Sequence, residues 1–457
     1  MKKVLLTGAT LVAFAAAGFA QTNTATTNQN GDKQTAQQTQ TGNHLKSTIS
    51  QDQQGGRNVG NFAGTLQTST GSAGNEATIE QNLNSVSNRA FVTQSGGTGN
   101  KGSITQDNLS GDGSIPVTGA TSAAAVKKAG GNWAGILQQG SNNTNTSVTQ
   151  SNSSYSNFGE IYQYGSSSRQ TSIDQSNTSS NNTAKINQGT AANPVNANGA
   201  VISQKGFSKD NEATVQQLTT GNLANVKQND NSDGNVATIK QIGTNGYETA
   251  TVSQGTNADR NKATVTQSGF GDFATVYQTD RSSQNEATIE QRSTSGGFGN
   301  TANIYQQYDA TRNSATVQQD GINNSANVGQ YNVTGSKATI AQDLKTTAGY
   351  GNVADIQQGE LGKAVSNKNV ASITQEYSLN TAKLLQVGDG NVGTLSQTGD
   401  SNVIKGVGSD WATQRGSNNT MTVTQDSGGV TPYVPNVASV SQIGNGNTAT
   451  ILQTGRP

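Results

Sequence analysis

The sequence contains no cysteine, a single histidine and only five prolines among 457 residues. Without cysteine, the fold cannot depend on disulfide bonds. Charged residues make up 12% of the chain, and 28 basic residues balance 28 acidic ones. Electrostatic capture of nucleic acid or of an anionic membrane is therefore not indicated, and we expect no nucleic-acid partner.

Residues that carry out catalysis or bind metals are also scarce. We interpret the lone His44, in a polar lead-in, as a solvated side chain. The chain is built from a repeated segment, described below, and no pair of carboxylates recurs at one position of that repeat. We therefore expect no enzyme, no catalytic residue and no cofactor. The segment "NDNSDG" (229–234) is similar to the start of a calcium loop, but Lys240 stands where an EF-hand needs a bidentate glutamate. We interpret the segment as a turn and predict no metal site.

Long apolar runs are absent except at the N-terminus. Lys2 and Lys3 precede "VLLTGATLVAFAAA", and Gly18-Phe19-Ala20 offers small residues for cleavage before Gln21. This pattern predicts an export signal over residues 1–20, and the run is too short to favour a membrane-spanning helix. We therefore expect a secreted mature chain that is not inserted in a membrane.

The composition is dominated by Gly, Asn, Gln, Ser and Thr, and only 30% of residues are hydrophobic. Chains so poor in apolar residues often stay disordered. Here, however, the balanced charge and the abundance of Asn and Gln favour association through β-structure.

One heptad recurs along the chain. "NEATIEQ" occurs at 75–81 and again at 285–291, and near-copies such as "NEATVQQ" (211–217) and "NKATVTQ" (261–267) lie between them. The common template is Asn-x-Ala-x-Φ-x-Gln, where Φ is aliphatic. Conservation of alternate positions within the template predicts β-strands with one constant face and one variable face.

We predict that the constant positions point inward and form structural ladders. They are Asn75, Ala77, Ile79, Gln81, Asn211, Ala213, Val215, Gln217, Asn222, Ala224, Val226, Gln228, Asn235, Ala237, Ile239, Gln241, Asn261, Ala263, Val265, Gln267, Asn285, Ala287, Ile289, Gln291, Asn447, Ala449, Ile451 and Gln453.

Short arcs such as "LTTG" (218–221) separate the strands, so two strands and an arc make one rung. One rung buries too little apolar area to offset its ordering entropy, whereas stacked rungs cover one another. We therefore predict an all-β fold over 43–457. It is a β-solenoid of about 15 strand–arc–strand rungs, with two facing parallel sheets in a cross-β arrangement. Residues 107–131 would form a long arc insertion.

Inward amides require hydrogen bonds. We expect each Asn to stack on an Asn and each Gln on a Gln, with side-chain amides bonded in continuous ladders along the axis. Glu248, Asp272, Arg169 and Ser336 occupy the Asn position of their segments, and we expect locally weak rungs there.

The last heptad, "NTATILQ" (447–453), has no polar capping element after it, so we expect open edges that pair head to tail into a fibre. Two alternatives share the fold. One is a monomeric adhesin, for which Trp133 and Trp411 are candidate contacts. The other is an ice-binding protein that uses the outward Thr positions, such as Thr214 and Thr238.

Segment 211–228, "NEATVQQLTTGNLANVKQ", resembles the curlin repeat, in which two Asn-x-Ala-x-x-x-Gln halves are joined by a short Gly-rich arc. The resemblance extends over roughly residues 40–457. It implies a subunit of curli, the extracellular amyloid fibres of bacterial biofilms. It also implies self-assembly, nucleation by a minor subunit and export through an outer-membrane pore.

The resemblance further implies a short segment after the signal that the pore reads, which here would be residues 21–42, and we expect this segment to be disordered. Two features depart from the family pattern. The chain holds several times the common number of repeats, and residues 21–42 are rich in Gln, Thr and Asn instead of Gly.

Overall fold

A computed structural model of the chain describes residues 22–31, 33–52, 60–69, 74–82, 88–107, 131–243, 246–293, 299–344, 350–360, 365–427 and 436–455. The predicted export signal (1–20) and residues 108–130 of the predicted insertion lie outside these ranges. No helix within the described ranges is long and apolar enough to cross a membrane.

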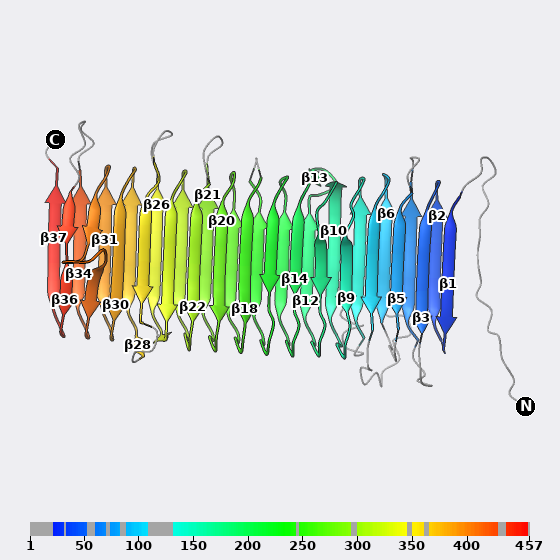
Figure 1. The fold of residues 1–457 in the computed structure, drawn as a ribbon, viewed down its shortest axis with the longest axis horizontal. Coiled ribbons are helices and arrows are strands. Elements are labelled where there is room, and N and C mark those ends of the chain that lie inside the picture. The colour runs from blue at the N-terminus through cyan, green and yellow to red at the C-terminus, as the bar shows by residue number, and fades with distance from the viewer. Residues whose placement is uncertain are drawn as a thin grey trace, which may run out of the picture.

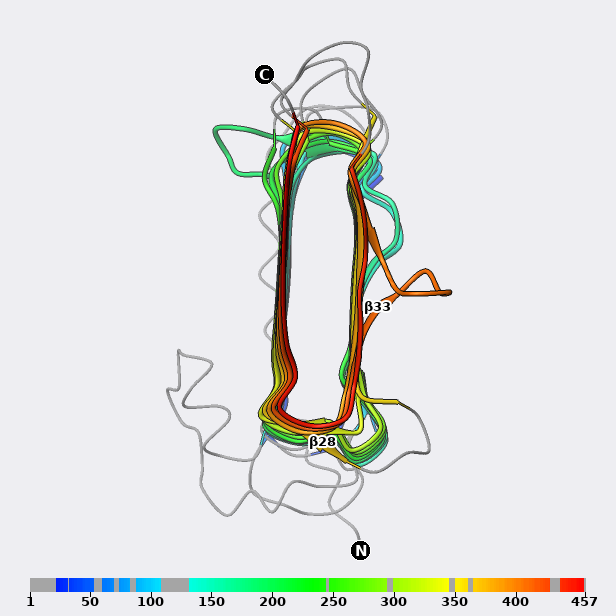
Figure 2. The ribbon, with the colours of Figure 1, turned by 90° about the vertical axis from the view of Figure 1, so that its left-hand side faces the viewer.

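The molecule is a β-solenoid built from two parallel sheets that face each other. Figure 1 shows the strands stacked side by side along one axis, with β1 (Thr24–Asn30) at one end of the stack and β37 (Thr448–Thr454) at the other. Seen down the axis in Figure 2, each rung is a narrow ring whose long sides are strands and whose short sides are arcs. The predicted all-β solenoid with two facing parallel sheets is confirmed.

Every strand of the first sheet pairs in parallel with the strand one rung away. The strands are β1 (Thr24–Asn30), β3 (Lys46–Asp52), β5 (Glu76–Gln81), β7 (Lys101–Gln106), β9 (Thr146–Gln150), β11 (Thr171–Asp174), β14 (Gly199–Ser203), β16 (Leu223–Lys227), β18 (Thr249–Gly255), β20 (Phe273–Thr279), β22 (Thr301–Gln307), β24 (Ser325–Tyr331), β27 (Val353–Gln358), β30 (Thr381–Val387), β32 (Val403–Lys405), β33 (Ala412–Arg415), β35 (Val437–Ser439) and β36 (Ser441–Ile443).

The second sheet supplies the other half of each rung. Its strands are β2 (Thr35–Thr41), β4 (Phe62–Thr68), β6 (Arg89–Ser95), β8 (Trp133–Gln139), β10 (Phe158–Ser166), β12 (Thr183–Gln188), β13 (Val195–Asn196), β15 (Glu212–Gln217), β17 (Val236–Gln241), β19 (Lys262–Gln267), β21 (Glu286–Arg292), β23 (Ser314–Asp320), β26 (Lys337–Asp343), β29 (Val370–Glu376), β31 (Val392–Thr398), β34 (Thr420–Asp426) and β37 (Thr448–Thr454). A two-stranded sheet on the arcs joins β25 (Val333–Thr334) to β28 (Ser366–Asn367).

The first sheet contains 18 strands. Because β32 shares a rung with β33, and β35 shares one with β36, these strands form 16 rungs. At the usual spacing between neighbouring strands, the stack is roughly 75 Å long.

The sixteenth rung comes from a segment predicted to lie outside the solenoid. The expectation that residues 21–42 are disordered is wrong over their described part. Strand β1 pairs with β3, and β2 pairs with β4, each over seven residues in register. Their Ala and Gln residues keep the alternation of the later rungs, and this alternation explains why the segment can extend the stack.

The register places equal residues of the template above one another. Between β15 and β17, Ala213 pairs with Ala237 and Val215 with Ile239. Repeated from rung to rung, this register produces columns of Ala and of Ile or Val between the sheets, and together they form one core cluster along the described stack. Each aliphatic side chain between the end rungs is covered by those of the rungs above and below, so stacking buries apolar area that a single rung would leave exposed.

The arcs are held by backbone conformation as well as by hydrogen bonds. The residue before the buried Asn of the second sheet adopts a left-handed conformation in successive rungs, with φ of 54° at Asp210, 64° at Gly234 and 54° at Arg260. Only Gly adopts this conformation without cost. Its repetition at Asp210 and Arg260 shows that stacking contacts set the arc shape and override local preference.

We predict that Ile239→Ala lowers the free energy of unfolding by about 2–5 kcal/mol, because Ile239 is fully buried in the aliphatic column. Thr238→Ala, on the outward face of the same strand, is the control and should change it by less than about 0.5 kcal/mol. Denaturant titration of the soluble chain measures both. Equal effects would contradict the inward and outward assignment.

Candidate assembly interface

The predicted inward side chains between Asn75 and Gln291 lie between the sheets, and none of them is more than 5% exposed. Those of the last heptad, Asn447, Ala449, Ile451 and Gln453, point the same way but are only half-buried. They belong to the final rung, which has a neighbour on one side only among the described strands.

Glutamine side chains form two continuous ladders, one in each sheet. In the second sheet, Gln217 Nε2 donates to Gln241 Oε1 at 2.9 Å, and Gln241 Nε2 donates to Gln267 Oε1 at 3.0 Å. The same bond joins every successive pair from Gln40 to Gln453, and a matching ladder in the first sheet runs from Gln29 to Gln442. The donor always belongs to the rung nearer the N-terminus, so both ladders have a direction.

In most rungs, the Gln amide also donates across the interior to the other sheet. Gln228 Nε2, in the first sheet, lies 3.0 Å from the carbonyl oxygen of Glu212 and 3.1 Å from that of Asn235, at the starts of β15 and β17 in the second sheet. A buried amide is costly unless its donors and acceptor are all paired. Here one Gln satisfies these groups and links four chain segments.

The predicted Asn ladder is wrong in its bonding. Asn211 Oδ1 accepts the main-chain N–H of Asn235 at 2.8 Å, and Asn211 Nδ2 donates to the carbonyl of Ser232 in the arc at 2.7 Å. The pattern repeats in most rungs, and a side-chain bond between two Asn occurs only locally, as from Asn402 to Asn380. Asn is one methylene shorter than Gln, so its amide stays beside the backbone and fixes the start of the strand.

Two acidic residues replace Asn in neighbouring rungs. Glu248 and Asp272 are both fully buried. Glu248 Oε1 accepts the N–H of Gly269 at 2.8 Å, whereas its Oε2 has no partner in the described structure. Burial raises the pKa of Glu248 to about 8, and the neighbouring Asp272 adds to that rise. Burial likewise raises the pKa of Asp272 to about 6, against hydrogen bonds from Asn300 and Ser293 that lower it.

At the other two positions where we expected weak rungs, Ser336 and Arg169, the structure does not place a buried carboxylate. Ser336 keeps the Asn bonding, because its N–H donates to Asn313 Oδ1 at 2.8 Å and its Oγ accepts the N–H of Asn369 at 3.2 Å. Arg169 does not occupy the inward position at all. It is exposed, and the buried Ser168 donates its N–H to Asn143 Oδ1 instead. The assignment of Arg169 to the inward column is therefore wrong.

The two ends of the stack leave complementary groups unpaired. At the last rung, Gln442 and Gln453 donate to main-chain carbonyls, but no described Gln lies beyond them to accept the second bond. At the first rung, no described group donates to Oε1 of Gln29 or Gln40, although both donate onward into their ladders. One end therefore offers amide donors and the other offers amide acceptors.

A comparison with known protein families matches residues 258–292 to the curlin associated repeat. This stretch is a curlin associated repeat. The matched residues include β19, β20 and β21, and the register of these strands continues through the rungs on either side. A search of curated proteins finds no match.

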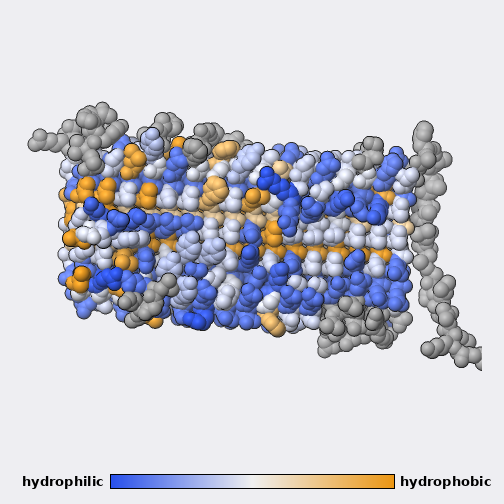
Figure 3. Space-filling view, viewed as in Figure 1, coloured by the Kyte–Doolittle hydropathy of each residue, from blue (hydrophilic) through white to orange (hydrophobic). Residues whose placement is uncertain are grey.

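The face of the solenoid in Figure 3 is largely polar, although apolar residues gather near its C-terminal end. A single outward column of Thr runs from Thr214 to Thr339 in the second sheet, but its neighbouring outward columns mix Glu, Lys, Gln and Val. This arrangement is not the regular two-column Thr array that the ice-binding alternative requires.

Neither tryptophan forms an open contact surface. Trp133, at the start of β8, is half-buried, with its ring 5.4 Å from that of Phe91 and 6.4 Å from that of Phe158. Trp411 ends the excursion over 406–411, which projects from the rung between β32 and β33 (Figure 2). Lys383 Nζ lies 5.7 Å from the centre of the Trp411 ring.

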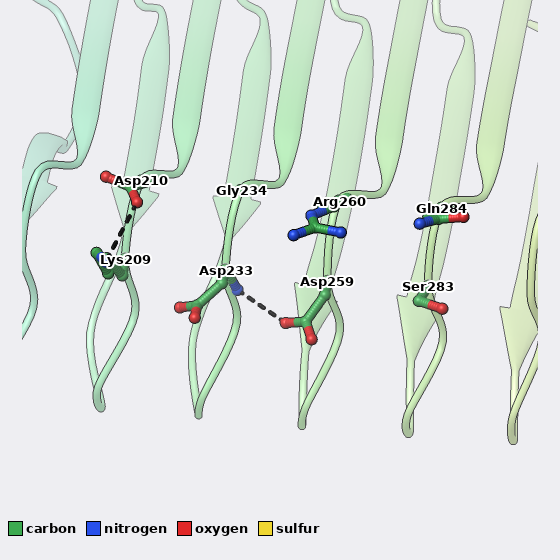
Figure 4. A pocket seen from close by; sticks show the side chains of 8 residues that line it. All are labelled: Lys209, Asp210, Asp233, Gly234, Asp259, Arg260, Ser283 and Gln284. Carbon is green, nitrogen blue, oxygen red and sulfur yellow. Dashed lines mark hydrogen bonds and ion pairs between the residues drawn. The ribbon is translucent and has the colours of Figure 1, made fainter.

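The arcs around the "NDNSDG" turn form a shallow hollow on the surface. Figure 4 shows Lys209, Asp233, Asp259 and Ser283 in successive rungs along it. Asp259 Oδ1 accepts the N–H of Asp233 at 3.1 Å, and Lys209 pairs with Asp210 at 3.6 Å. Among the described residues, no group of three or more His, Cys, Asp or Glu is placed to hold a metal ion.

We predict that replacing Gln228 and Gln241 with Leu slows assembly more than replacing Lys227 and Lys240 with Ser. The Gln side chains bond to the rungs above and below, whereas the Lys side chains are exposed on the same strands. Both pairs of substitutions leave the backbone unchanged. Thioflavin fluorescence and sedimentation follow assembly, and equal lag times would contradict a role of the ladders.

We predict that stability falls as the pH rises from 5 to 9. Because the pKa values of Glu248 and Asp272 are raised in the folded chain, folding favours their protonated forms. This contribution is present below the ordinary values of 4.5 and 3.8, and it is lost as the pH passes about 6 and then about 8.

Glu248→Gln stays neutral and keeps the acceptor for Gly269, so its melting temperature should fall less over this range. Glu212→Gln, at an exposed position, is the control and should behave like the unchanged chain. Scanning calorimetry of the soluble chain at both pH values measures the difference. Parallel pH profiles for the unchanged chain and Glu248→Gln would rule the explanation out.

Proposed function

We propose that this curlin-repeat protein is a secreted structural subunit that polymerises head to tail into extracellular amyloid fibres. The observation that carries the proposal is the directional Gln ladder. Its unpaired donors on Gln442 and Gln453 match the unpaired acceptors on Gln29 and Gln40 of a second copy.

The donor-to-acceptor direction of the Gln ladders decides which ends of two copies can associate. Two C-terminal ends placed together would oppose donors to donors, and two N-terminal ends would oppose acceptors to acceptors. Only the C-terminal rung of one copy against the N-terminal rung of the next continues both ladders. Such an interface joins two different surfaces, and because the ends lie at opposite ends of a straight stack (Figure 1), it does not close into a ring.

Growth would proceed by templating. An exposed end rung offers main-chain donors and acceptors together with the Gln amides, and an incoming chain gains both sets of bonds as it adds its own rung. Outward ion pairs such as that of Lys262 with Glu286, at 2.9 Å, lie on the exposed faces and leave the axial contacts free.

The curlin repeat also supports the remaining parts of the proposal. We expect a minor nucleating subunit and an outer-membrane secretion pore as partners, and a structural role without catalysis. A monomeric adhesin would share the fold, so fibre formation is the property that separates the two functions.

To test the proposal, residues 21–457 are refolded from denaturant at neutral pH and observed by electron microscopy and fibre diffraction. We expect unbranched filaments with a meridional reflection near 4.7–4.8 Å. A soluble, monodisperse β-rich monomer at all concentrations would overturn the proposal and favour the adhesin. Seeding with preformed filaments should shorten the lag phase if growth is templated.

A further inference from the structure

The first rung differs from all the others in its aliphatic positions. Elsewhere along the described stack, at least one of the two Φ positions holds Ile, Val or Leu. In β1 and β2 these positions are occupied by Thr27, which pairs with Ile49, and by Gln38, which pairs with Thr65. The apolar columns therefore end in polar side chains at the N-terminal end.

The side chain of Gln38 takes no part in the Gln ladders. Its Nε2 crosses the interior and donates to the carbonyl of Thr26 at 2.9 Å, while its Oε1 is buried without a partner in the described structure. In the next rung, the hydroxyls of Thr65 and Ser47 bond to each other at 2.6 Å. The interior is thus polar over the N-terminal end and apolar beyond it.

The C-terminal rung has the opposite character. Val440 and Ile451 fill both of its aliphatic positions. Three of its outward side chains are also apolar and exposed, with exposed fractions of 48% at Val437, 77% at Ile443 and 70% at Leu452, among outward Ser and Thr. The outward positions of β1 and β2 hold only Thr, Asn and Gln.

A head-to-tail junction in the register of the stack brings these unlike surfaces together. Ile451 would lie against Gln38 of the second copy, and Val440 against its Thr27. The Gln ladders cross such a junction without a break, as the proposed function requires, but the aliphatic columns do not.

We propose that Thr27 and Gln38 make the junction between copies the weakest plane of the fibre, so that a fibre separates there into folded subunits. This inference rests on the proposed function. From the second rung on, neighbouring rungs of a subunit share the amide ladders and at least one apolar column, and the first rung is joined to the second by the chain itself, whereas no peptide bond crosses the junction between copies. The rungs of Glu248 and Asp272 also keep Val252 and Val276 in their columns, so they do not compete as a plane of separation.

The test compares fibres of the full chain with fibres of the double variant Thr27→Val and Gln38→Ile, which fills both aliphatic positions. The matched control is Thr26→Val and Gln37→Ile, one residue earlier on the same strands and facing outward. Each fibre is titrated with guanidinium. Sedimentation measures how much chain is released into solution, and circular dichroism measures how much β-structure is lost.

For the unchanged fibre, we expect release at lower guanidinium concentration than loss of β-structure. In the double variant, release should shift to higher concentration and approach the loss of β-structure, whereas the control should match the unchanged fibre. Coincident transitions in the unchanged fibre, or a double variant that does not shift, would overturn the inference.

If the double variant did not fold, Gln38→Val alone would serve, and a missing shift there would count equally against the inference. If the unchanged chain formed no fibre, the proposed function would fail instead.

Discussion

The hydrogen bond between glutamine side chains of neighbouring rungs is the interaction on which the rest of the structure depends. It fixes the register, because a shift by one residue would turn Gln outward and leave buried acceptors unpaired. With the register fixed, Ala stacks on Ala and Ile on Ile or Val, and the thin core of each rung is covered by its neighbours. The second hydrogen of the same amide ties one sheet to the other, so the ladder also sets the distance between the sheets.

Low hydrophobicity and balanced charge are consistent with this arrangement. A chain with 30% hydrophobic residues cannot form a broad globular core, but a solenoid needs only two aliphatic positions and two Ala positions per rung. The remaining stabilisation comes from main-chain and side-chain hydrogen bonds repeated many times. The core of such a fold is a continuous column and not a single central cluster. This explains why inserted residues can project from the arcs without disturbing the rungs on either side.

The sequence was sufficient to predict the class of fold, because the template alternates strictly and recurs with short arcs. It was also sufficient to place Asn, Ala, Ile or Val and Gln on the inward face. It was insufficient where side-chain length decided the outcome. Asn and Gln look equivalent in a repeat pattern, yet Gln bonds to the matching side chain of the next rung, whereas Asn bonds mainly to the main chain of that rung.

The N-terminal strands were missed for a related reason. Residues 24–41 lack the aliphatic residue that identifies the other strands, and the resemblance assigned residues 21–42 to a segment read by the secretion pore. Arg169 was misplaced because the spacing of the arc before β11 differs by one residue, which only the buried position of Ser168 reveals.

The common direction of the Gln amides also has an electrical consequence. Each side-chain amide in both ladders points its N–H toward the C-terminal end and its carbonyl toward the N-terminal end, so their dipoles add along the axis, as peptide dipoles do in a helix. Copies joined head to tail would extend the sum without cancellation. A filament formed in this way would therefore be a polar rod, and two such filaments lying side by side would attract each other more when they run in opposite directions.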